Sequence, residues 1–201
     1  MRPSLAAQSQ LVIATHNAGK LAEFETLFKP FDLVPVGAAA LGLAEPEEDG
    51  TSFAENALLK ARLASQATGL PALGDDSGLC VAALNGAPGI YSARWAGQPR
   101  DFAVAMGTVW QRLADKPDRR AFFIAVLALV LPDGQECCFE GRVEGHISWP
   151  MRGDNGFGYD PIFVAQGYDT RFAELDPAFK DQISHRARAF RAFAEACIPS
   201  L

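Results

Sequence analysis

Two adjacent carboxylates, Asp75 and Asp76, stand between glycines in the stretch 74–78 and are the first candidates for chemistry. Carboxylate oxygens are the hard ligands that Mg²⁺ prefers. Successive side chains of an extended segment point in opposite directions, so at most one of the two faces a given site, and the spacing does not indicate which. An acidic turn is the alternative interpretation. A second acidic group, more typical of a solvated loop, comprises Glu45, Glu47, Glu48 and Asp49.

The run Thr15–Lys20, with sequence THNAGK, is a candidate phosphate site. It follows an apolar segment and precedes a helical pattern, and the free N–H groups at a helix N-terminus bind anions. Lys20 adds a positive charge in the first turn. The run does not have the P-loop pattern, and a solvated loop is the alternative.

Polar side chains at Ser52, Asn56 and Lys60 recur every four residues, which places a hydroxyl, an amide and an ammonium on one face of a predicted helix. A solvent-exposed stripe is the alternative. Small neighbours would allow another element to lie close to this face; they are Ala54, Ala57, Ala61 and Ala64.

An aromatic run and a basic cluster complete the candidates. Phe157–Asp160, with sequence FGYD, offers aromatic faces for a nucleobase, a glycine that permits close approach and a carboxylate that accepts from a purine N–H. A buried aromatic cluster is the alternative.

Lys180 and the run Ser184–Arg186 place basic side chains near a helix N-terminus, where the helix dipole disfavours them unless an anion binds. An ordinary charged surface is the alternative.

Other chemistries have weak support. The histidines His16, His146 and His185 lack zinc-site spacing, and no G-x-S-x-G motif occurs. The formal charge of −6 argues against a broad surface for nucleic acid. The four cysteines form no C-x-x-C pair, so we expect reduced thiols.

The sequence indicates no membrane segment. The longest apolar run, Ala121–Leu131, is too short to span a bilayer. The first ten residues contain no apolar core of a signal peptide. We therefore expect a cytoplasmic protein that binds neither a membrane nor nucleic acid.

The hydrophobic pattern predicts the elements that position these candidates. Strands are predicted over Leu11–Ala14, Asp32–Val36, Leu70–Gly74, Leu79–Leu84, Arg120–Leu131, Gln135–Glu144 and Pro161–Ala165. Helices are predicted over residues 21–28, over 56–68 after a capping box at 52–55, over Phe102–Ala114, from Asp176-Pro177, and over His185–Ala196 with Ser184 as its cap. The turn Asp133-Gly134 predicts a long hairpin, so we expect one α/β domain with a partly antiparallel sheet. The residues alone thus predict a phosphate- and Mg²⁺-binding protein with aromatic side chains near the site.

From Leu11 to Ala196 the chain also resembles the inosine/xanthosine triphosphate pyrophosphatase family. Six motifs carry the resemblance: Thr15–Lys20, Ser52–Ala57 with Lys60-Ala61, Asp75–Leu79, Ala87–Arg94, Phe157–Pro161 and Ser184–Arg186. Each motif alone is weak, but six in order at the expected separations are highly specific. His16 differs from the Gly or Asn often found at its position.

The resemblance implies hydrolysis of ITP, dITP and XTP to the monophosphate and pyrophosphate, with Mg²⁺ and in a homodimer. Such an enzyme removes deaminated purine nucleotides from the pool before they enter DNA and RNA. The implied fold is a single elongated α/β domain, with a mixed sheet, flanking helices and two lobes around a central nucleotide-binding cleft. This domain would cover residues 11–199, and residues 1–10 would be an N-terminal extension.

The resemblance also implies roles for individual residues. Asp76 would be the general base and a metal ligand, and Glu48 a second metal ligand. The triphosphate and ribose would contact Thr15, His16, Asn17, Ala18, Gly19, Lys20, Lys60 and Ser77. The base would contact Phe157, Gly158, Tyr159, Asp160, Lys180, His185 and Arg186.

Two other functions remain open at this point. A relaxed pyrophosphatase for modified pyrimidine or ordinary nucleotides would share the phosphate site and differ in the base pocket. A nucleotide sensor would keep the pocket without the catalytic base. The joint presence of Asp76, Glu48 and Lys60 argues against the sensor.

Overall fold

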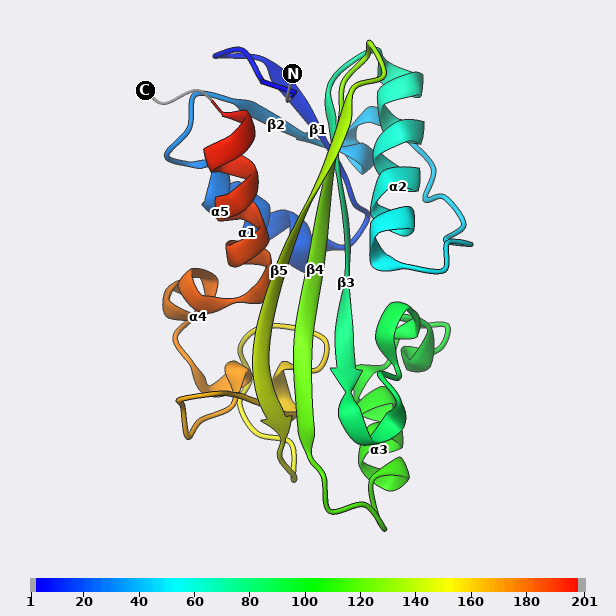
Figure 1. Cartoon of the computed structure of the whole chain (residues 1–201), viewed down its shortest axis with the longest axis vertical. Helices are drawn as coiled ribbons and strands as arrows, with labels where there is room; N and C mark the ends of the chain where they lie inside the picture. Colours follow the sequence, from blue (N-terminus) through cyan, green and yellow to red (C-terminus); the bar gives the residue numbers. More distant parts are fainter. Residues whose placement is uncertain (1–2, 199–201) are drawn as a thin grey trace. The chain divides into compact units, whose positions relative to one another are not determined.

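A computed structural model describes residues 3–198 (Figure 1). Its six strands form one mixed sheet. The order across the sheet is β2-β1-β3-β4-β5-β6. The strands are β1 (Gln10–Ala14), β2 (Val34–Gly37), β3 (Ala72–Val81), β4 (Arg120–Val130), β5 (Glu136–Ile147) and β6 (Phe163–Ala165). β1 pairs in parallel with both β2 and β3, whereas β5 and β6 are antiparallel. The predicted mixed sheet is therefore confirmed.

Five α-helices accompany the sheet in the described part of the chain. They are α1 (Ala18–Phe28), α2 (Phe53–Thr68), α3 (Phe102–Arg112), α4 (Pro177–Ile183) and α5 (His185–Cys197). Side chains cap the first four: Asn17, Ser52, Asp101 and Asp176 each accept a hydrogen bond from a backbone N–H in the first turn. The predicted end of α2 is confirmed, because Gly69 adopts the left-handed conformation there. None of the described helices is long and apolar enough to cross a membrane.

The chain divides into two compact units. The first comprises residues up to 76, 125–141 and from 187 onward, and the second comprises 77–124 and 142–186. In the first unit, β4 is buried on both faces, which explains its continuous apolar sequence. Its residues Ala125, Leu127 and Leu129 share a core with phenylalanines of α1 and α5. The intervening Val126, Ala128 and Val130 pack with Ala57 and Ala61 of α2.

The second unit has a core of its own, rich in aromatic rings. Phe123 of β4 lies edge-on to Phe163 of β6 and is stacked near Phe172, with ring centroids 4.6 and 5.9 Å apart. The core also contains α3 residues, among them Met106 and Val109. This packing holds the segments on which the aromatic and basic candidates lie.

The structure corrects several sequence predictions. The two short strands predicted around Asp75 and Asp76 are one continuous strand, β3, because lysines neutralise both buried carboxylates. The strand predicted over Pro161–Ala165 begins with a 3₁₀ turn and is extended only over Phe163–Ala165. The strand predicted over Asp32–Val36 begins at Val34.

The described residues before β1, 3–9, belong to the first unit. Leu5 is buried in the core of this unit, and its N–H donates to the carbonyl of Cys197, 2.8 Å away. Residues 1, 2 and 199, at the limits of the predicted extension and domain, lie outside the described residues.

Candidate active site

In the first unit, α2 packs closely on β3, and the candidate site lies at this contact. A Cβ atom on Gly74 would lie 2.0 Å from the carbonyl oxygen of Ala57, so only glycine permits this approach. Ala57 and Ala61 are fully buried in the contact. The small residues therefore bring the polar side chains of α2 against the carboxylates of β3, as the alanine pattern predicted.

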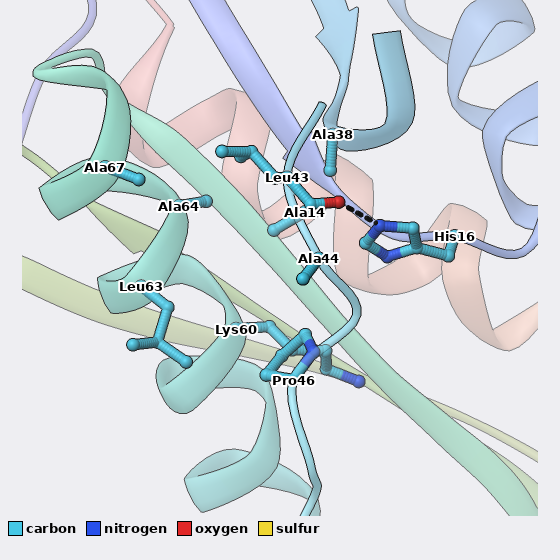
Figure 2. Close-up of a pocket in the computed structure, with 10 residues that line it drawn as sticks. All are labelled: Ala14, His16, Ala38, Leu43, Ala44, Pro46, Lys60, Leu63, Ala64 and Ala67. Atoms are coloured by element: carbon cyan, nitrogen blue, oxygen red, sulfur yellow. Dashed lines mark hydrogen bonds between the residues drawn. The ribbon is translucent and has the colours of Figure 1, made fainter. Parts of the chain in front are cut away.

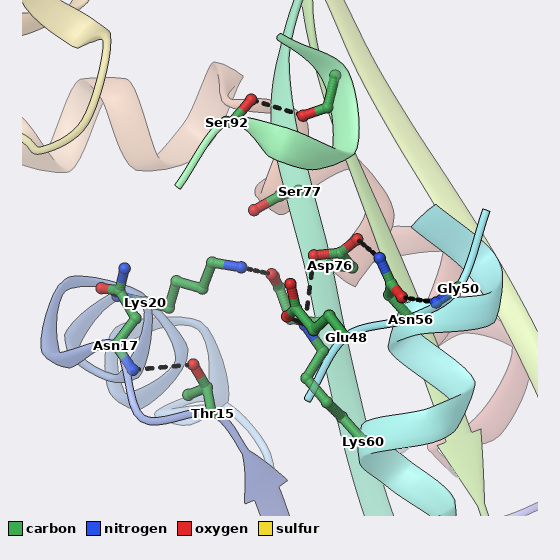
Figure 3. Close-up of polar contacts among 12 residues, drawn as sticks. Thr15, Asn17, Lys20, Glu48, Gly50, Asn56, Lys60, Asp76, Ser77 and Ser92 are labelled. Carbon is green, nitrogen blue, oxygen red and sulfur yellow. Dashed lines mark hydrogen bonds and ion pairs between the residues drawn. The ribbon is translucent and has the colours of Figure 1, made fainter. Parts of the chain in front are cut away.

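Lys60 joins two carboxylates (Figure 3). Its Nζ lies 2.6 Å from Oε1 of Glu48 and 3.3 Å from Oδ1 of Asp76. The amide nitrogen of Asn56 donates to the other oxygen of Asp76 across 3.1 Å. The solvated-stripe alternative is wrong for Asn56 and Lys60, whose exposed fractions are 0% and 8%. Ser52 instead caps the helix.

Asp75 points to a different lysine, as the alternation along an extended strand requires. Its Oδ1 forms an ion pair with the Nζ of Lys20, which lies in the first turn of α1. Asn17 caps the same helix by accepting from the Lys20 N–H, and Thr15 Oγ1 accepts from the Asn17 N–H. The β1–α1 loop is therefore held close to the carboxylate pair.

The remaining residues of the predicted phosphate loop differ in exposure. Ala18 is exposed and Gly19 is half-buried at the start of α1. His16 is half-buried, and its imidazole contacts the carbonyl of Leu43 rather than a residue of its own loop.

Burial and charge shift the proton affinities in opposite directions at this cluster. Burial and, to a smaller extent, the negative charge of Glu48 raise the pKa of Asp76, and together they exceed the lowering caused by Lys60, Lys20 and the Asn56 hydrogen bond. Burial would lower the pKa of Lys60, but the charges of Asp76, Glu48 and Asp75, with the hydrogen bond to Glu48, together exceed that effect and raise it. Lys60 therefore stays protonated, and Asp76 is a stronger proton acceptor than an ordinary aspartate.

The donor set of this cluster fits Mg²⁺. This ion takes one or two protein carboxylates and completes its shell with water and substrate phosphates. Oxygens of Glu48 and Asp76 both approach one point, the Lys60 ammonium. No group of three or more His, Cys, Asp or Glu side chains that could hold a metal occurs among residues 3–198. The two carboxylates therefore suit a metal shared with a phosphate ligand.

A second cluster, in the second unit, surrounds the ring of Phe157. The Nζ of Lys180 lies 4.9 Å from the ring centroid and 2.6 Å from Oδ2 of Asp160. That same oxygen accepts from the Phe157 N–H across 3.0 Å. A Cβ atom on Gly156 would lie 2.1 Å from it, so the turn requires glycine. Lys180 and Asp160 are both almost fully buried.

Arg186, at the start of α5, also lies against the ring of Phe157. Its guanidinium carbon is 5.7 Å from the centroid of Phe157, and its Nη2 donates to Ser77 Oγ across 3.0 Å. The side chain is 1% exposed. The ordinary-surface alternative is therefore wrong for Lys180 and Arg186.

Two of the predicted base contacts, Tyr159 and His185, have other partners within the unit. The Tyr159 hydroxyl donates to the Ser92 carbonyl across 2.8 Å, and burial raises its pKa. The His185 ring stacks on Phe123 with centroids 4.8 Å apart. Gly158, half-buried, has a φ of 68°, which favours glycine. Their ligand contacts stay predictions.

Two residues of the first cluster received no role in the predicted site. The sequence indicates Asn56 only as part of the polar helix face, although its amide binds Asp76 directly. Asp75 was recognised only as a possible alternative to Asp76, and its lysine partner is 55 residues away in the sequence. The four-residue spacing could have identified Asn56, whereas no local signal links Asp75 to Lys20.

The chain is similar to known proteins over nearly its full length. Residues 11–196 match the Ham1 family. A protein of Zymomonas mobilis named dITP/XTP pyrophosphatase is 55% identical over 192 residues, covering 94% of this chain and 92% of the relative. The structure of a HAM1 protein from Coxiella burnetii is similar, with a TM-score of 0.86, 41% identity and coverage of 94% of this chain and 98% of that one. The Staphylococcus aureus Ham1 protein has a TM-score of 0.82 and 41% identity, with coverage of 92% and 98%.

Proposed function

This chain belongs to the Ham1 family, and we propose on that basis that it hydrolyses deaminated purine nucleoside triphosphates. The substrates are ITP, dITP and XTP, and the products are the nucleoside monophosphate and pyrophosphate. Relatives about half identical over nearly the full chain carry the name dITP/XTP pyrophosphatase. In the cell this activity would remove such nucleotides before they enter DNA and RNA.

The observation that carries the proposal is the Glu48–Lys60–Asp76 cluster. Asp76 is a buried carboxylate with a raised pKa, and Asn56 fixes its orientation. Asp76 accepts a proton from the attacking water, whose oxygen forms a new bond to phosphorus. The anhydride bond between the α- and β-phosphates breaks, and the leaving pyrophosphate takes its electron pair.

Glu48 and Asp76 would hold Mg²⁺, and the ion would neutralise phosphate charge when bound. A triphosphate carries about four negative charges at neutral pH, so the local cations matter more than the net charge of −6. Lys60 and Lys20 supply positive charge from two different helices. The loop from Thr15 to Gly19 adds backbone N–H groups, and Ser77 a hydroxyl for the phosphates or ribose.

We assign base recognition to the cluster around Phe157. Its ring stacks on the purine, and Arg186 and Lys180 donate hydrogen bonds to the 6-oxo group of hypoxanthine or xanthine. Adenine has an amino group there and cannot accept these bonds. His185, Asp160, Gly158 and Tyr159 complete the proposed base contacts.

We also propose a homodimer in the cytoplasm, as the family resemblance implies. Light scattering at micromolar concentration tests the assembly directly: the dimer has twice the 21.6 kDa mass of the chain.

The decisive experiment measures pyrophosphate release from ITP, XTP, dUTP, ATP and GTP, each with and without Mg²⁺. The proposal expects rapid release from ITP and XTP only, and only with the metal. Comparable rates on dUTP or ATP would instead identify a relaxed pyrophosphatase. Tight ITP binding without any release would identify a sensor. Orthophosphate as the product would contradict the proposed bond cleavage.

A further inference from the structure

The proposed metal ligand Glu48 lies on a segment without regular structure. Residues 43–50 form neither helix nor strand, between a 3₁₀ turn that ends at Leu41 and the N-terminus of α2. Their side chains are exposed or half-buried. The position of Glu48 therefore depends on where this segment, here called the Glu48 loop, is attached.

The imidazole of His16 holds the beginning of the Glu48 loop through a hydrogen bond to its backbone (Figure 2). Its Nε2 lies 2.7 Å from the carbonyl oxygen of Leu43. A carbonyl only accepts, so Nε2 carries the proton and donates. His16 lies next to Thr15, in the same loop as the cap of α1. The imidazole thus ties the Glu48 loop to the proposed phosphate loop.

The end of the loop has its own attachment. The Gly50 N–H donates to Oδ1 of Asn56 across 2.9 Å, and a Cβ atom on Gly50 would lie 2.5 Å from that oxygen. The amide nitrogen of Asn56 binds Asp76. Glu48 therefore lies between two anchored points, Leu43 and Gly50.

A cavity beside the loop limits how much packing can hold it. The cavity measures about 300 Å³ and is lined mainly by small apolar side chains. Its lining residues are Ala14, His16, Ala38, Leu43, Ala44, Pro46, Lys60, Leu63, Ala64 and Ala67. The loop residues Leu43, Ala44 and Pro46 line this cavity, so they have fewer packing contacts with the rest of the protein on that side. At Leu43 the hydrogen bond from His16 acts together with the Leu43 N–H bond to the Ala38 carbonyl, 3.1 Å away.

We propose that His16 is a positioning residue, whose imidazole holds the Glu48 loop so that Glu48 faces Lys60 and Asp76. This inference rests on the proposed function only in assigning Glu48 to Mg²⁺. The resemblance implies that His16 contacts the substrate, and in the structure its imidazole bonds the Leu43 carbonyl. The residue that differs from the family's usual Gly or Asn thus acts on the metal site through the loop.

Two substitutions distinguish the effect of the His16 hydrogen-bond donor from the effect of its aromatic ring. His16→Phe keeps a planar ring and removes the hydrogen bond, whereas His16→Gln keeps an N–H donor close to the position of Nε2. The first readout is hydrogen exchange of the Leu43 and Gly50 amides in metal-free protein, since both amides donate in the structure. The Gly69 amide, which donates to Ser65 at the end of α2, is the internal control.

The expected result is faster exchange at Leu43 and Gly50 in His16→Phe, unchanged exchange at Gly69, and recovery in His16→Gln. The second readout is ITP hydrolysis against Mg²⁺ concentration. Loss of one hydrogen bond should raise half-saturating Mg²⁺ about three- to tenfold in His16→Phe, with a smaller effect on kcat at saturating metal. His16→Gln should restore most of the metal affinity.

The inference is overturned if His16→Phe leaves loop exchange unchanged, or if it loosens the loop without raising half-saturating Mg²⁺. It is also overturned if Gln behaves like Phe in both readouts, since the donor would then be irrelevant. Absence of ITP hydrolysis in the unsubstituted protein would refute the proposed function instead. In that case the exchange experiment would still decide whether His16 holds the loop.

Discussion

Asp75 and Asp76 are adjacent in β3, yet their carboxylates bind lysines from different helices. Asp75 pairs with Lys20 of α1, and Asp76 pairs with Lys60 of α2. The exposed fractions of the two aspartates are 1% and 5%. Two carboxylates this buried and this close in sequence would be unfavourable without such cations. Because successive side chains of β3 point in opposite directions, the two neighbouring carboxylates lie on opposite faces of the strand.

Substituting each aspartate separately should distinguish their roles. Asp76→Asn keeps the shape but removes the proton acceptor, so kcat on ITP should fall about 10²–10⁴-fold. Asp75→Asn is the matched control, because its carboxylate faces Lys20 instead of the proposed water and metal. Steady-state assays at saturating Mg²⁺ should show a clearly smaller loss for Asp75→Asn. Equal losses, with both variants folded, would contradict the assignment of the base.

The charge of Lys60 should control the proton affinity of Asp76. The positive charge stabilises the ionised carboxylate and lowers its pKa, so Lys60→Met should move the pKa of Asp76 to a higher value. Lys20→Met should act in the same direction with a smaller effect. Carboxyl ¹³C NMR titration of metal-free protein measures both shifts. An unchanged or lowered Asp76 pKa in Lys60→Met would show that this ion pair does not form in solution.

Phe157 should provide affinity without selectivity. Every purine has a face for stacking, so Phe157→Ala should weaken binding of all nucleotides by about 1–3 kcal/mol. Measuring kcat/KM on ITP, XTP, GTP and ATP should give similar fold-losses across the series. A loss confined to one base would mean that the ring takes part in selecting the base.

Arg186 should provide selectivity through its donors. Arg186→Ala should lower kcat/KM for ITP and XTP much more than for the already poor ATP, since only the 6-oxo bases accept its hydrogen bond. The same assays test this variant. A uniform loss on every substrate would place the guanidinium against phosphate and refute the proposed 6-oxo contact. Rejection of GTP, which also carries a 6-oxo group, requires a further feature near its 2-amino group.

The close approach of α2 to β3 should make Gly74 intolerant of a methyl group. A Cβ atom there would lie 2.0 Å from the Ala57 carbonyl oxygen, and forcing the two apart should cost about 1–3 kcal/mol. Thermal unfolding of Gly74→Ala should show Tm lower by several degrees. Gly107 is the control: it lies within α3 with no atom near its Cβ position, so Gly107→Ala should raise stability by about 0.5–1 kcal/mol. A Gly74→Ala protein as stable as the parent would contradict the tight contact.

Local sequence signals determined most of the elements. The pattern from Ser52 to Gly69 specified a capped helix that the structure confirms at both ends, because caps act through neighbouring backbone groups. The apolar run of β4 and the Asp133-Gly134 turn specified a long hairpin in the same way. The motifs also identified the side chains that form the two clusters. For all of these features the sequence itself carries the necessary information.

Only the tertiary structure decided how those side chains pair. Lys20 and Asp75 are 55 residues apart, and Lys60 and Asp76 are 16 apart, so no local periodicity relates them. Their ion pairs allow the acidic stretch to continue as a buried strand, where local propensity predicted an interruption. The resemblance had already singled out Glu48 among the four acidic loop residues, but only the structure shows that it pairs with Lys60 and that His16 bonds the Leu43 carbonyl. These choices depend on the close packing of α2 on β3 and on backbone contacts between distant loops, which exist only once the chain has folded.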